Sequence, residues 1–485
     1  MKKILAPVII AALLISLVPA AFAKTEVLRV YNWQDYIDDG KDEDGAQVDK
    51  SVMQLWEEDY FARTGKKVRV QYDTFETNET MLNTLRTGKT TYDLVCPSDY
   101  VIQKMIAATR SGTDENISIE EFDLSKMENY RKYVSPYISN IFESYGWTKY
   151  AVGYMWGTVG FLYNPEKVKQ KDVSTWALPW NTNYRNRISC KDVSRDAYVM
   201  GSLYVYRDKL SAKVKEWEDG KLTDDELQKT VNDIANLTDD ETIDKVEQAL
   251  SLMKENIYGF EVDSGKSDIV SGKIDANLAW SGDAVYAMDL ADEEDDKRLQ
   301  FVIPNEGSTI WFDGWLMPKG ANTELAQDFV DFLCRPEIAA KNMGYIGYCS
   351  VVAGDDIFAF VKDTYGDEKG KIDYDLTYFF GGTVSDKYIG KNGKISIKTD
   401  SPYRQLATLY PSSEQTAKLG VMEDFGDRNE KVLEMWSKVK SNSVSALSYV
   451  TMGLIIFLIA AAAVFNQHKK NIRRRRIKRL REKND

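Results

Sequence analysis

Residues 27–36 read Val-Leu-Arg-Val-Tyr-Asn-Trp-Gln-Asp-Tyr. The run begins with the short apolar pattern of a β-strand and ends in an aromatic and an acidic side chain. Further strand- and helix-like segments then alternate along the chain: a helix over 48–64, a strand over 68–72, a helix over 78–87 and a strand over 92–96. This alternation predicts parallel βαβ units and an α/β fold.

Tryptophans recur beside acidic residues in three segments that are far apart in the chain: 32–36, 280–283 and 311–315. Aromatic faces attract ammonium groups and cover methylenes, while carboxylates supply the counter-charge. If folding brings these segments together, they form a binding site for a small organic cation.

Both ends of the chain carry membrane-related patterns. Residues 1–23 have the basic start, apolar run and small-residue cleavage site of a secretory signal, the alternative being an uncleaved membrane helix. Residues 444–465 are uncharged and long enough to span a bilayer, and the basic tail 466–485 follows them. A buried core helix is the alternative for 444–465. We expect a single-pass protein of the cell membrane, with residues 24–440 outside and the C-terminus in the cytoplasm.

The composition of the outer segment restricts its function. It holds 51 of the 63 basic and 73 of the 75 acidic residues, a net charge of −22, which disfavours nucleic acid as a partner. The one histidine, His468, lies beyond the predicted span, so histidine-based nucleophilic catalysis and the usual zinc sites are excluded outside. Catalysis by a pair of carboxylates stays open.

The four cysteines are widely spaced, at positions 96, 190, 334 and 349. A bridge between Cys334 and Cys349 is conceivable, but a chain with a large core favours free, buried thiols. The outer segment is too long for one ordinary core, so two lobes are expected.

Eight segments in register resemble the spermidine/putrescine-binding proteins of ABC importers, the polyamine branch of the periplasmic-binding-protein superfamily. They are residues 30–36, 72–81, 92–100, 154–158, 192–196, 280–284, 311–314 and 344–348. The resemblance covers roughly residues 27–440. It implies two α/β lobes with a ligand cleft between them. Lobe 1 is then 24–149 with 310–350, and lobe 2 is 150–309 with 351–440.

The resemblance also implies roles for particular residues. The aromatic walls would be Trp33, Tyr36, Tyr100, Trp280 and Trp311. Asp313 and Asp196 would hold the ammonium groups, and Asp35 would be a flanking acid. Ser98 and Tyr348 would be polar contacts.

Two positions depart from the family pattern. Val193 stands where a spermidine binder carries an aspartate, and Met422 replaces a glutamine. The loss of one carboxylate leaves the choice between a triamine and a diamine open. The membrane span at 444–465 is also unusual for this family.

Structural roles are expected for several conspicuous residues near these motifs. Trp156 and Trp315 are expected to pack in the core or hinge, and residues 77–79 to begin a helix. Asp283 follows Ser-Gly at a strand-to-helix turn and is expected to cap that helix.

The resemblance therefore implies a monomeric polyamine receptor that would deliver putrescine or spermidine to an ABC permease and, indirectly, to its ATPase. The sequence predicts no enzyme activity, catalytic residue, cofactor, metal or nucleic-acid partner. Two alternatives stay open: the same fold binding another organic cation or an amino-acid derivative, and a carboxylate-based surface hydrolase.

Overall fold

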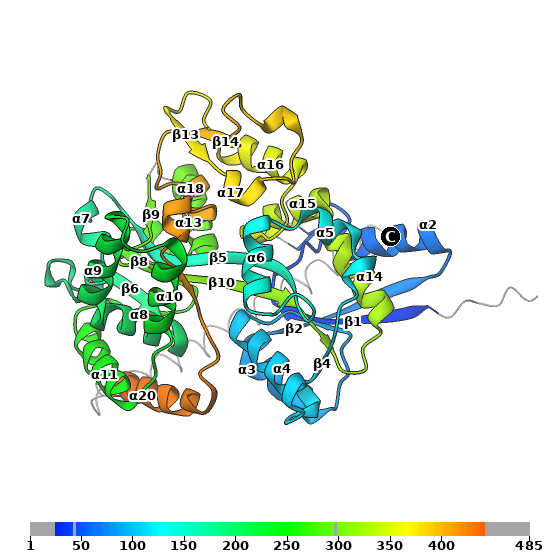
Figure 1. Ribbon diagram of the computed structural model, residues 1–485, viewed down its shortest axis with the longest axis horizontal. Coiled ribbons are helices and arrows are strands. Elements are labelled where there is room, and N and C mark those ends of the chain that lie inside the picture. Colours follow the sequence, from blue (N-terminus) through cyan, green and yellow to red (C-terminus); the bar gives the residue numbers. More distant parts are fainter. Residues whose placement is uncertain (1–24, 42–44, 295–297, 442–485) are drawn as a thin grey trace, which may run out of the picture.

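The computed structural model describes residues 25–41, 45–294 and 298–441. It places two groups of helices and strands side by side, joined by long strands (Figure 1). We call the group around β1 lobe 1 and the group around β8 lobe 2. The predicted signal peptide, membrane span and basic tail lie outside the described residues.

Lobe 1 is built on a three-stranded sheet with the order β2-β1-β3, in which both pairs are parallel. Its elements are β1 (Glu26–Trp33), α2 (Val52–Thr64), β2 (Val68–Phe75), α3 (Asn78–Thr87), β3 (Leu94–Val95), α4 (Asp99–Ser111), β4 (Ile119–Glu120), α5 (Glu128–Tyr133), α6 (Pro136–Ser144), β11 (Met317–Pro318), α14 (Thr323–Leu333) and α15 (Pro336–Ile346). The predicted parallel βαβ units are confirmed.

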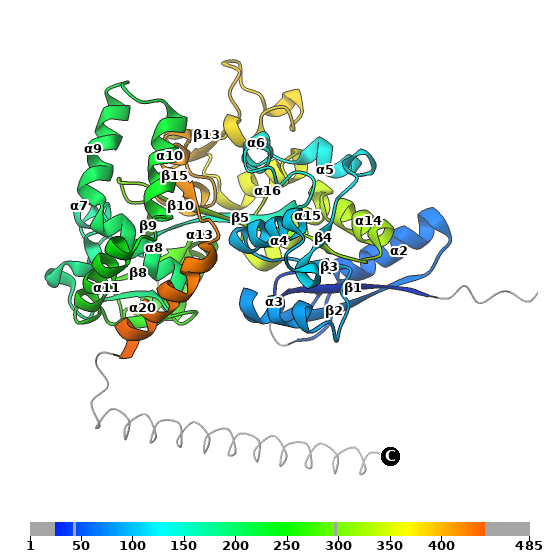
Figure 2. The same cartoon turned by 60° about the horizontal axis from the view of Figure 1, so that its bottom comes forward.

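Lobe 2 also contains parallel strands, because β6 pairs in parallel with both β7 and β8. Its helices α8 and α20 both pack against α11 on the outer side (Figure 2). The elements are α7 (Gln170–Val173), β6 (Ile188–Lys191), α8 (Ser194–Val205), α9 (Arg207–Glu218), α10 (Asp224–Ala235), α11 (Asp240–Lys254), β7 (Gly259–Glu261), α12 (Gly265–Val270), β8 (Ala276–Trp280), α13 (Ser281–Glu294), β9 (Gln300–Val302) and α20 (Asn429–Ser441).

Two antiparallel strands, β5 (Val152–Tyr163) and β10 (Ser308–Trp315), run between the lobes. Every residue of β5 is buried, which explains its nearly continuous apolar sequence. β5 also pairs with β8, β9 and β12 (Cys349–Ser350), while β10 pairs with β15 (Leu419–Val421).

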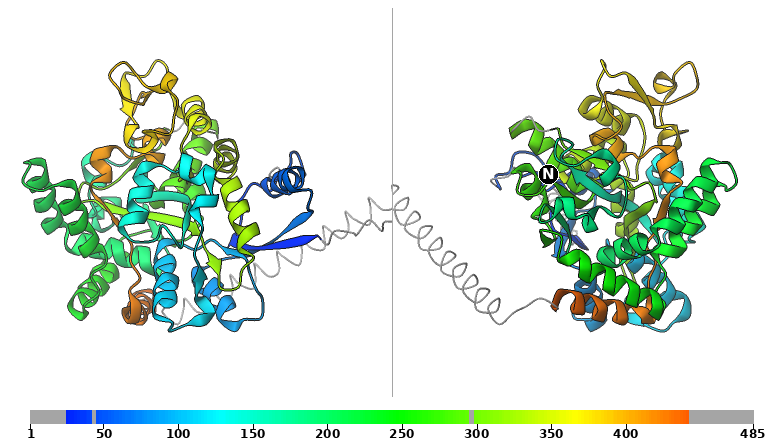
Figure 3. Two further views of the ribbon diagram at one scale, coloured as in Figure 1. Left: turned by 45° about the vertical axis from the view of Figure 1, so that its right-hand side comes forward. Right: turned by 90° about the vertical axis from the view of Figure 1, so that its left-hand side faces the viewer.

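A further group of elements lies above the junction of the lobes in Figures 1 and 3. It contains α16 (Asp355–Tyr365), β13 (Ile372–Asp375), α17 (Thr377–Phe380), β14 (Ser396–Thr399), α18 (Gln405–Leu409) and α19 (Ser413–Thr416).

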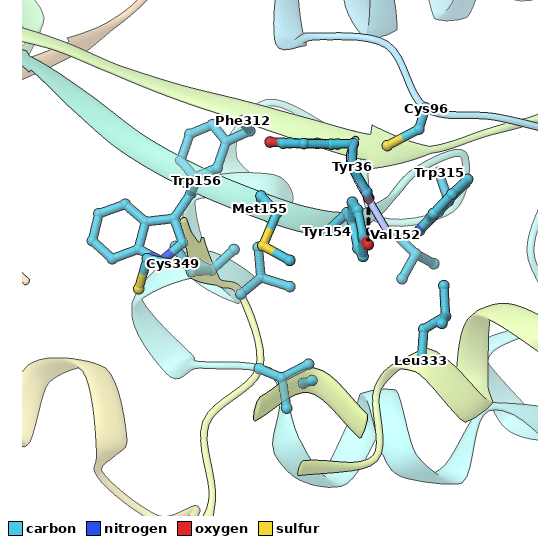
Figure 4. Packing of buried hydrophobic residues seen from close by; sticks show 14 of the residues in the cluster. Tyr36, Cys96, Val152, Tyr154, Met155, Trp156, Phe312, Trp315, Leu333 and Cys349 are labelled. Carbon is cyan, nitrogen blue, oxygen red and sulfur yellow. Dashed lines mark hydrogen bonds between the residues drawn. The ribbon is translucent and has the colours of Figure 1, made fainter. Parts of the chain in front are cut away.

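Buried apolar side chains form two clusters, which do not follow the lobes throughout. One gathers lobe 1 together with α12, α13 and most buried residues of 351–421, and the other gathers most of the rest of lobe 2 with residues 422–439. The lobe boundaries drawn from the sequence stay a proposal. Trp156 and Trp315 are 0 % and 1 % exposed, so their predicted core positions are confirmed (Figure 4).

Local signals fixed several element ends. The helix expected from residue 48 begins at Val52, because Ser51 forms a capping box with Gln54. Thr77 accepts a hydrogen bond from the Thr80 N–H at the start of α3, so the predicted helix start is confirmed. All four cysteines are buried and free, as expected.

Within residues 25–41, 45–294 and 298–441, no helix is both long enough and apolar enough to cross a membrane. The span expected at 444–465 lies outside these residues and stays a prediction.

Candidate ligand-binding site

Asp313 occupies an irregular position of β10. The pairing of β10 with β5 shifts register between Asp313 and Gly314, and such bulges re-aim the neighbouring side chains. Trp311 lies two residues earlier, on the same face of the strand, whereas Phe312 points into the core. Trp311 is also the one residue of β10 that is not fully buried.

Two hydroxyl groups from lobe 1 hold the Asp313 carboxylate. Ser98 Oγ donates to Oδ1 and Tyr36 OH donates to Oδ2, each at 2.7 Å. Tyr36 follows the carboxyl end of β1 and Ser98 follows that of β3, so neighbouring parallel strands present both donors at one edge of the sheet. Asp313 is 6 % exposed, and no cation of the described residues forms an ion pair with it.

Burial makes the charge of Asp313 unfavourable. It raises the pKa of Asp313 from 3.8 to about 6, although both hydroxyl donors act in the opposite direction. Burial also raises the pKa of Asp99 to about 8, and the negative charge of Asp313 contributes to that shift. Asp313 has no ion-pair partner among the described residues, and the charge of Arg195 offsets the burial of Asp99 only in part, so this position favours a cation or a proton.

Aromatic rings surround this acidic position. The Trp311 and Tyr348 ring centroids lie 5.4 Å apart, and those of Tyr348 and Tyr36 lie 5.9 Å apart. The indole N–H of Trp311 is buried and has no hydrogen-bond acceptor in the described part of the chain. A methyl group on Gly157, which pairs with Trp311 across the strands, would lie 2.5 Å from the indole ring.

Tyr348 connects this position to lobe 2. Its hydroxyl donates to Asp283 Oδ1 at 2.9 Å. Asp283 Oδ2 contacts Lys191 Nζ at 3.1 Å, so the carboxylate is engaged by these two side chains and not as the helix cap we expected. The Tyr348 ring lies so close to Gly282 that any β-carbon there would collide with it, 1.6 Å from Cδ1.

The two predicted site residues of lobe 2 contact each other. Trp280 ends β8, and its Nε1 donates to Asp196 Oδ1 at 3.2 Å. Burial raises the pKa of Asp196, while the charges of Lys191 and Arg195 oppose the shift. Lys191 Nζ lies 4.4 Å from the centroid of the Trp280 ring.

Tyr100 has partners of its own. Its hydroxyl accepts from Asn78 Nδ2 at 3.0 Å and donates to Glu79 at 3.2 Å. The Arg195 guanidinium lies 4.0 Å from the ring centroid and 4.1 Å from that of Phe425. Because Arg195 comes from lobe 2, this stack links the lobes and covers a face that we expected to contact ligand.

The remaining two predicted residues lie beside Tyr36 in the chain, but no hydrogen bond among the described residues joins either of them to Asp313. The Trp33 ring packs against Phe75 at 4.6 Å, and its N–H is buried without an acceptor. Asp35 is exposed at a backbone φ of 52° and accepts a hydrogen bond from Gln34. Figure 4 shows how Tyr36 itself is held, with Tyr154 OH donating to its carbonyl at 2.8 Å.

Sequence reasoning missed four charged residues of this region: Asp99, Lys191, Arg195 and Glu261. Lys191 carried a usable signal, because a lysine that ends a short apolar strand is unusual in a buried sheet. Arg195 stood inside a quoted motif, but nothing in its spacing indicated that it would stack on Tyr100.

Comparisons with known proteins agree with this architecture. The profile of the family "Bacterial extracellular solute-binding protein" matches residues 57–354, and the chain belongs to this family. It is 26 % identical over 339 residues to the spermidine/putrescine-binding periplasmic protein of Salmonella typhimurium, covering 70 % of this chain and 81 % of that one. It is also 26 % identical over 361 residues to the putrescine-binding periplasmic protein PotF of Escherichia coli, covering 72 % and 84 %.

Solved structures share the two-lobe α/β fold. A crystal structure of PotD, the spermidine/putrescine ABC transporter substrate-binding protein of Streptococcus pneumoniae, aligns with a TM-score of 0.56 at 23 % identity. The alignment covers 86 % of this chain and 99 % of that one. A putative spermidine/putrescine ABC transporter protein from Listeria monocytogenes aligns with a TM-score of 0.58 at 23 % identity, covering 86 % and 100 %.

Asp313→Asn is expected to stabilise the ligand-free protein at high pH. A carboxyl group whose pKa is higher in the folded than in the unfolded state lowers the free energy of unfolding at pH values above its folded pKa. At pH values below its unfolded pKa the group is protonated in both states and has no such effect. The shift from 3.8 to about 6 corresponds to about 3 kcal/mol, so the gain should appear at pH 8 and vanish near pH 4. Urea unfolding at both pH values measures it, with the exposed Asp373→Asn as control. Equal effects of Asp313→Asn at both pH values would contradict this assignment.

Gly282→Ala is expected to displace the Tyr348 ring and to lower the free energy of unfolding by about 1–3 kcal/mol. Gly259→Ala is the matched control, because a β-carbon there meets no atom within 4 Å. Thermal unfolding of both variants compares them. If Gly282→Ala melts like Gly259→Ala, the close approach of Tyr348 to α13 is wrong.

Proposed function

We propose that this chain is the extracytoplasmic receptor of an ABC importer, and that it binds a small amine of the polyamine class, such as putrescine or spermidine, between its lobes. One observation carries the proposal. Asp313 is a buried carboxylate with two hydroxyl donors, aromatic neighbours and no cation of the described chain in ion-pair contact. A ligand ammonium supplies what this position lacks.

The relatives support the choice of ligand class. Both curated proteins compared above are named for the binding of putrescine, one of them also for spermidine. Family membership supports a binding function over a catalytic one. We further propose that the protein is a monomer and that it delivers its ligand to the permease of an importer that is driven by an ATPase.

Aromatic and acidic groups have to act together in this site. Polyamine nitrogens behave like lysine and are charged at neutral pH. A charge-assisted hydrogen bond to Asp313 contributes about 1.5–3 kcal/mol, and four methylenes covered by aromatic rings contribute about 3 kcal/mol. Micromolar binding requires about 8 kcal/mol after the cost of association, which exceeds even the sum of these two contributions. Further charge-assisted hydrogen bonds and cation–π contacts of about 0.5–2 kcal/mol each have to supply the rest.

Binding is proposed to proceed by closure of the lobes around the amine. Tyr100 and Arg195, which stack across the lobes, would stabilise the closed arrangement. We further propose that residues 444–465 tether the receptor beside its permease and thereby raise its effective concentration there.

Calorimetric titration of the purified protein with putrescine, cadaverine, spermidine and spermine tests the ligand class. We expect binding of at least one amine and a loss of about 100-fold in affinity in Asp313→Asn, because the variant leaves the ammonium without a counter-charge. Trp311→Ala should weaken binding about tenfold through the loss of the ring contact. The exposed Asp373→Asn serves as control.

If none of the four amines binds, the proposed ligand class is wrong. Binding of a different organic cation or of an amino-acid derivative would then assign the fold another ligand. If the wild type hydrolyses a glycan and Asp313→Asn does not, the protein is an enzyme and the proposed binding function is wrong.

The affinity for the amine should also fall as the pH falls through about 6. The ammonium binds the ionised form of Asp313, and burial raises the pKa of this residue to about 6 in the free protein. Titrations at pH 5, 6 and 8 measure the effect. An affinity that is constant across this range would show that Asp313 does not hold the ammonium.

Removal of residues 442–485 is expected to release the receptor from the membrane fraction, because the uncharged segment lies within them. Fractionation of cells that express the full and shortened chains measures this, with the affinity for amine as the control. A shortened chain that stays in the membrane fraction would contradict the tether.

A further inference from the structure

Three parallel strands of lobe 2 end side by side in side chains that carry charge or an aromatic face. β6 ends at Lys191, β7 at Glu261 and β8 at Trp280. Open α/β sheets bind ligands at the carboxyl ends of their strands, so Lys191 stands at the edge where a ligand is expected.

The Lys191 ammonium is held as a bound organic cation would be. Nζ donates to the Val262 carbonyl at 2.9 Å and lies 3.1 Å from Asp283 Oδ2 and 3.2 Å from Glu261 Oε1. The Trp280 ring centroid lies 4.4 Å away. Two carboxylates, a carbonyl and an indole face therefore surround a side chain that is 1 % exposed.

The contacts with Lys191 are not the only ones that Glu261 and Asp283 make. Glu261 also accepts hydrogen bonds from Asn277 Nδ2 at 3.0 Å and from the Gly265 N–H at 2.8 Å. Asp283 also accepts from Tyr348, and Lys266 lies 3.7 Å from it. Each acid thus already has a positive partner from the chain itself.

The predicted second ammonium partner is also compensated. Asp196 accepts from Trp280, and the charges of Lys191 and Arg195 both act on it. Among the acids at the junction of the lobes, Asp313 differs, because its partners are two neutral hydroxyls.

We propose that Lys191 is a tethered cation that fills the second ammonium position and so determines specificity. The site then recognises one ammonium group, at Asp313, and the far end of the ligand gains little from carrying a second. The ligand class is a primary amine with an apolar stem, and a monoamine binds nearly as well as the diamine of equal length. This inference rests on the proposed function.

Titrations of the full chain with putrescine and n-butylamine test the proposal, because the two share a four-carbon stem and differ by one ammonium group. The wild type is expected to bind both within about fivefold. Lys191→Met frees Asp283 and Glu261 for a ligand ammonium, so it should raise the preference for putrescine by about ten- to hundredfold, as one charge-assisted hydrogen bond contributes. Lys245→Met removes a lysine that lies near Tyr206, away from the site, and should leave the ratio unchanged.

Lys191→Met leaves Glu261 without its cation and Asp283 with Lys266 alone, at 3.7 Å, so the variant can fail to fold. Lys191→Met combined with Glu261→Gln removes one charge of each sign and is expected to show the same gain for putrescine. A wild type that prefers putrescine by more than about 100-fold overturns the role of Lys191, whether or not the variants fold. So does an unchanged ratio in a folded variant.

Asp313→Asn separates this proposal from the proposed function. If the wild type binds both amines and Asp313→Asn binds neither, the proposed function is supported. The ratio of the affinities for putrescine and n-butylamine then decides the role of Lys191. If the wild type binds no amine at all, the proposed function fails, and the role of Lys191 fails with it.

Discussion

A carboxylate buried without a counter-charge is the constraint around which this site is built. Ser98 and Tyr36 of lobe 1 hold Asp313 in place but leave its charge uncompensated. Burial of an ionised carboxylate without a cationic partner lowers the free energy of unfolding. The bulge re-aims Asp313, and Gly157 leaves room for both Trp311 and the Ser281 hydroxyl.

The two ends of the site differ in how their charges are balanced. Around Asp313 the described residues supply acids, hydroxyls and aromatic rings, and no cation among them forms an ion pair with it. Around Trp280 the chain supplies both signs, because Lys191 lies against the ring and between two carboxylates. Tyr348 joins the ends, since its ring packs against Trp311 and its hydroxyl bonds to Asp283.

Local pattern was enough to predict much of the fold. Alternating strands and helices predicted the parallel βαβ units of lobe 1, and Trp156 lies in the core as expected. The family resemblance implied that Asp313, Tyr36 and Ser98 lie near one another, but the hydrogen bonds between them were not predicted. No local pattern indicates such contacts, because these residues are up to 277 positions apart. Charge pairing could not be predicted in this way. Lys191 and Asp283 are 92 residues apart, and no local pattern of either one indicates the other.

A crystal structure of the protein grown with putrescine at pH 8 tests the central claim most directly. The account predicts an amine nitrogen about 2.7–2.9 Å from a carboxylate oxygen of Asp313, with the methylenes against the Trp311 ring. An amine bound elsewhere, with Asp313 still held only by Tyr36 and Ser98, would contradict it.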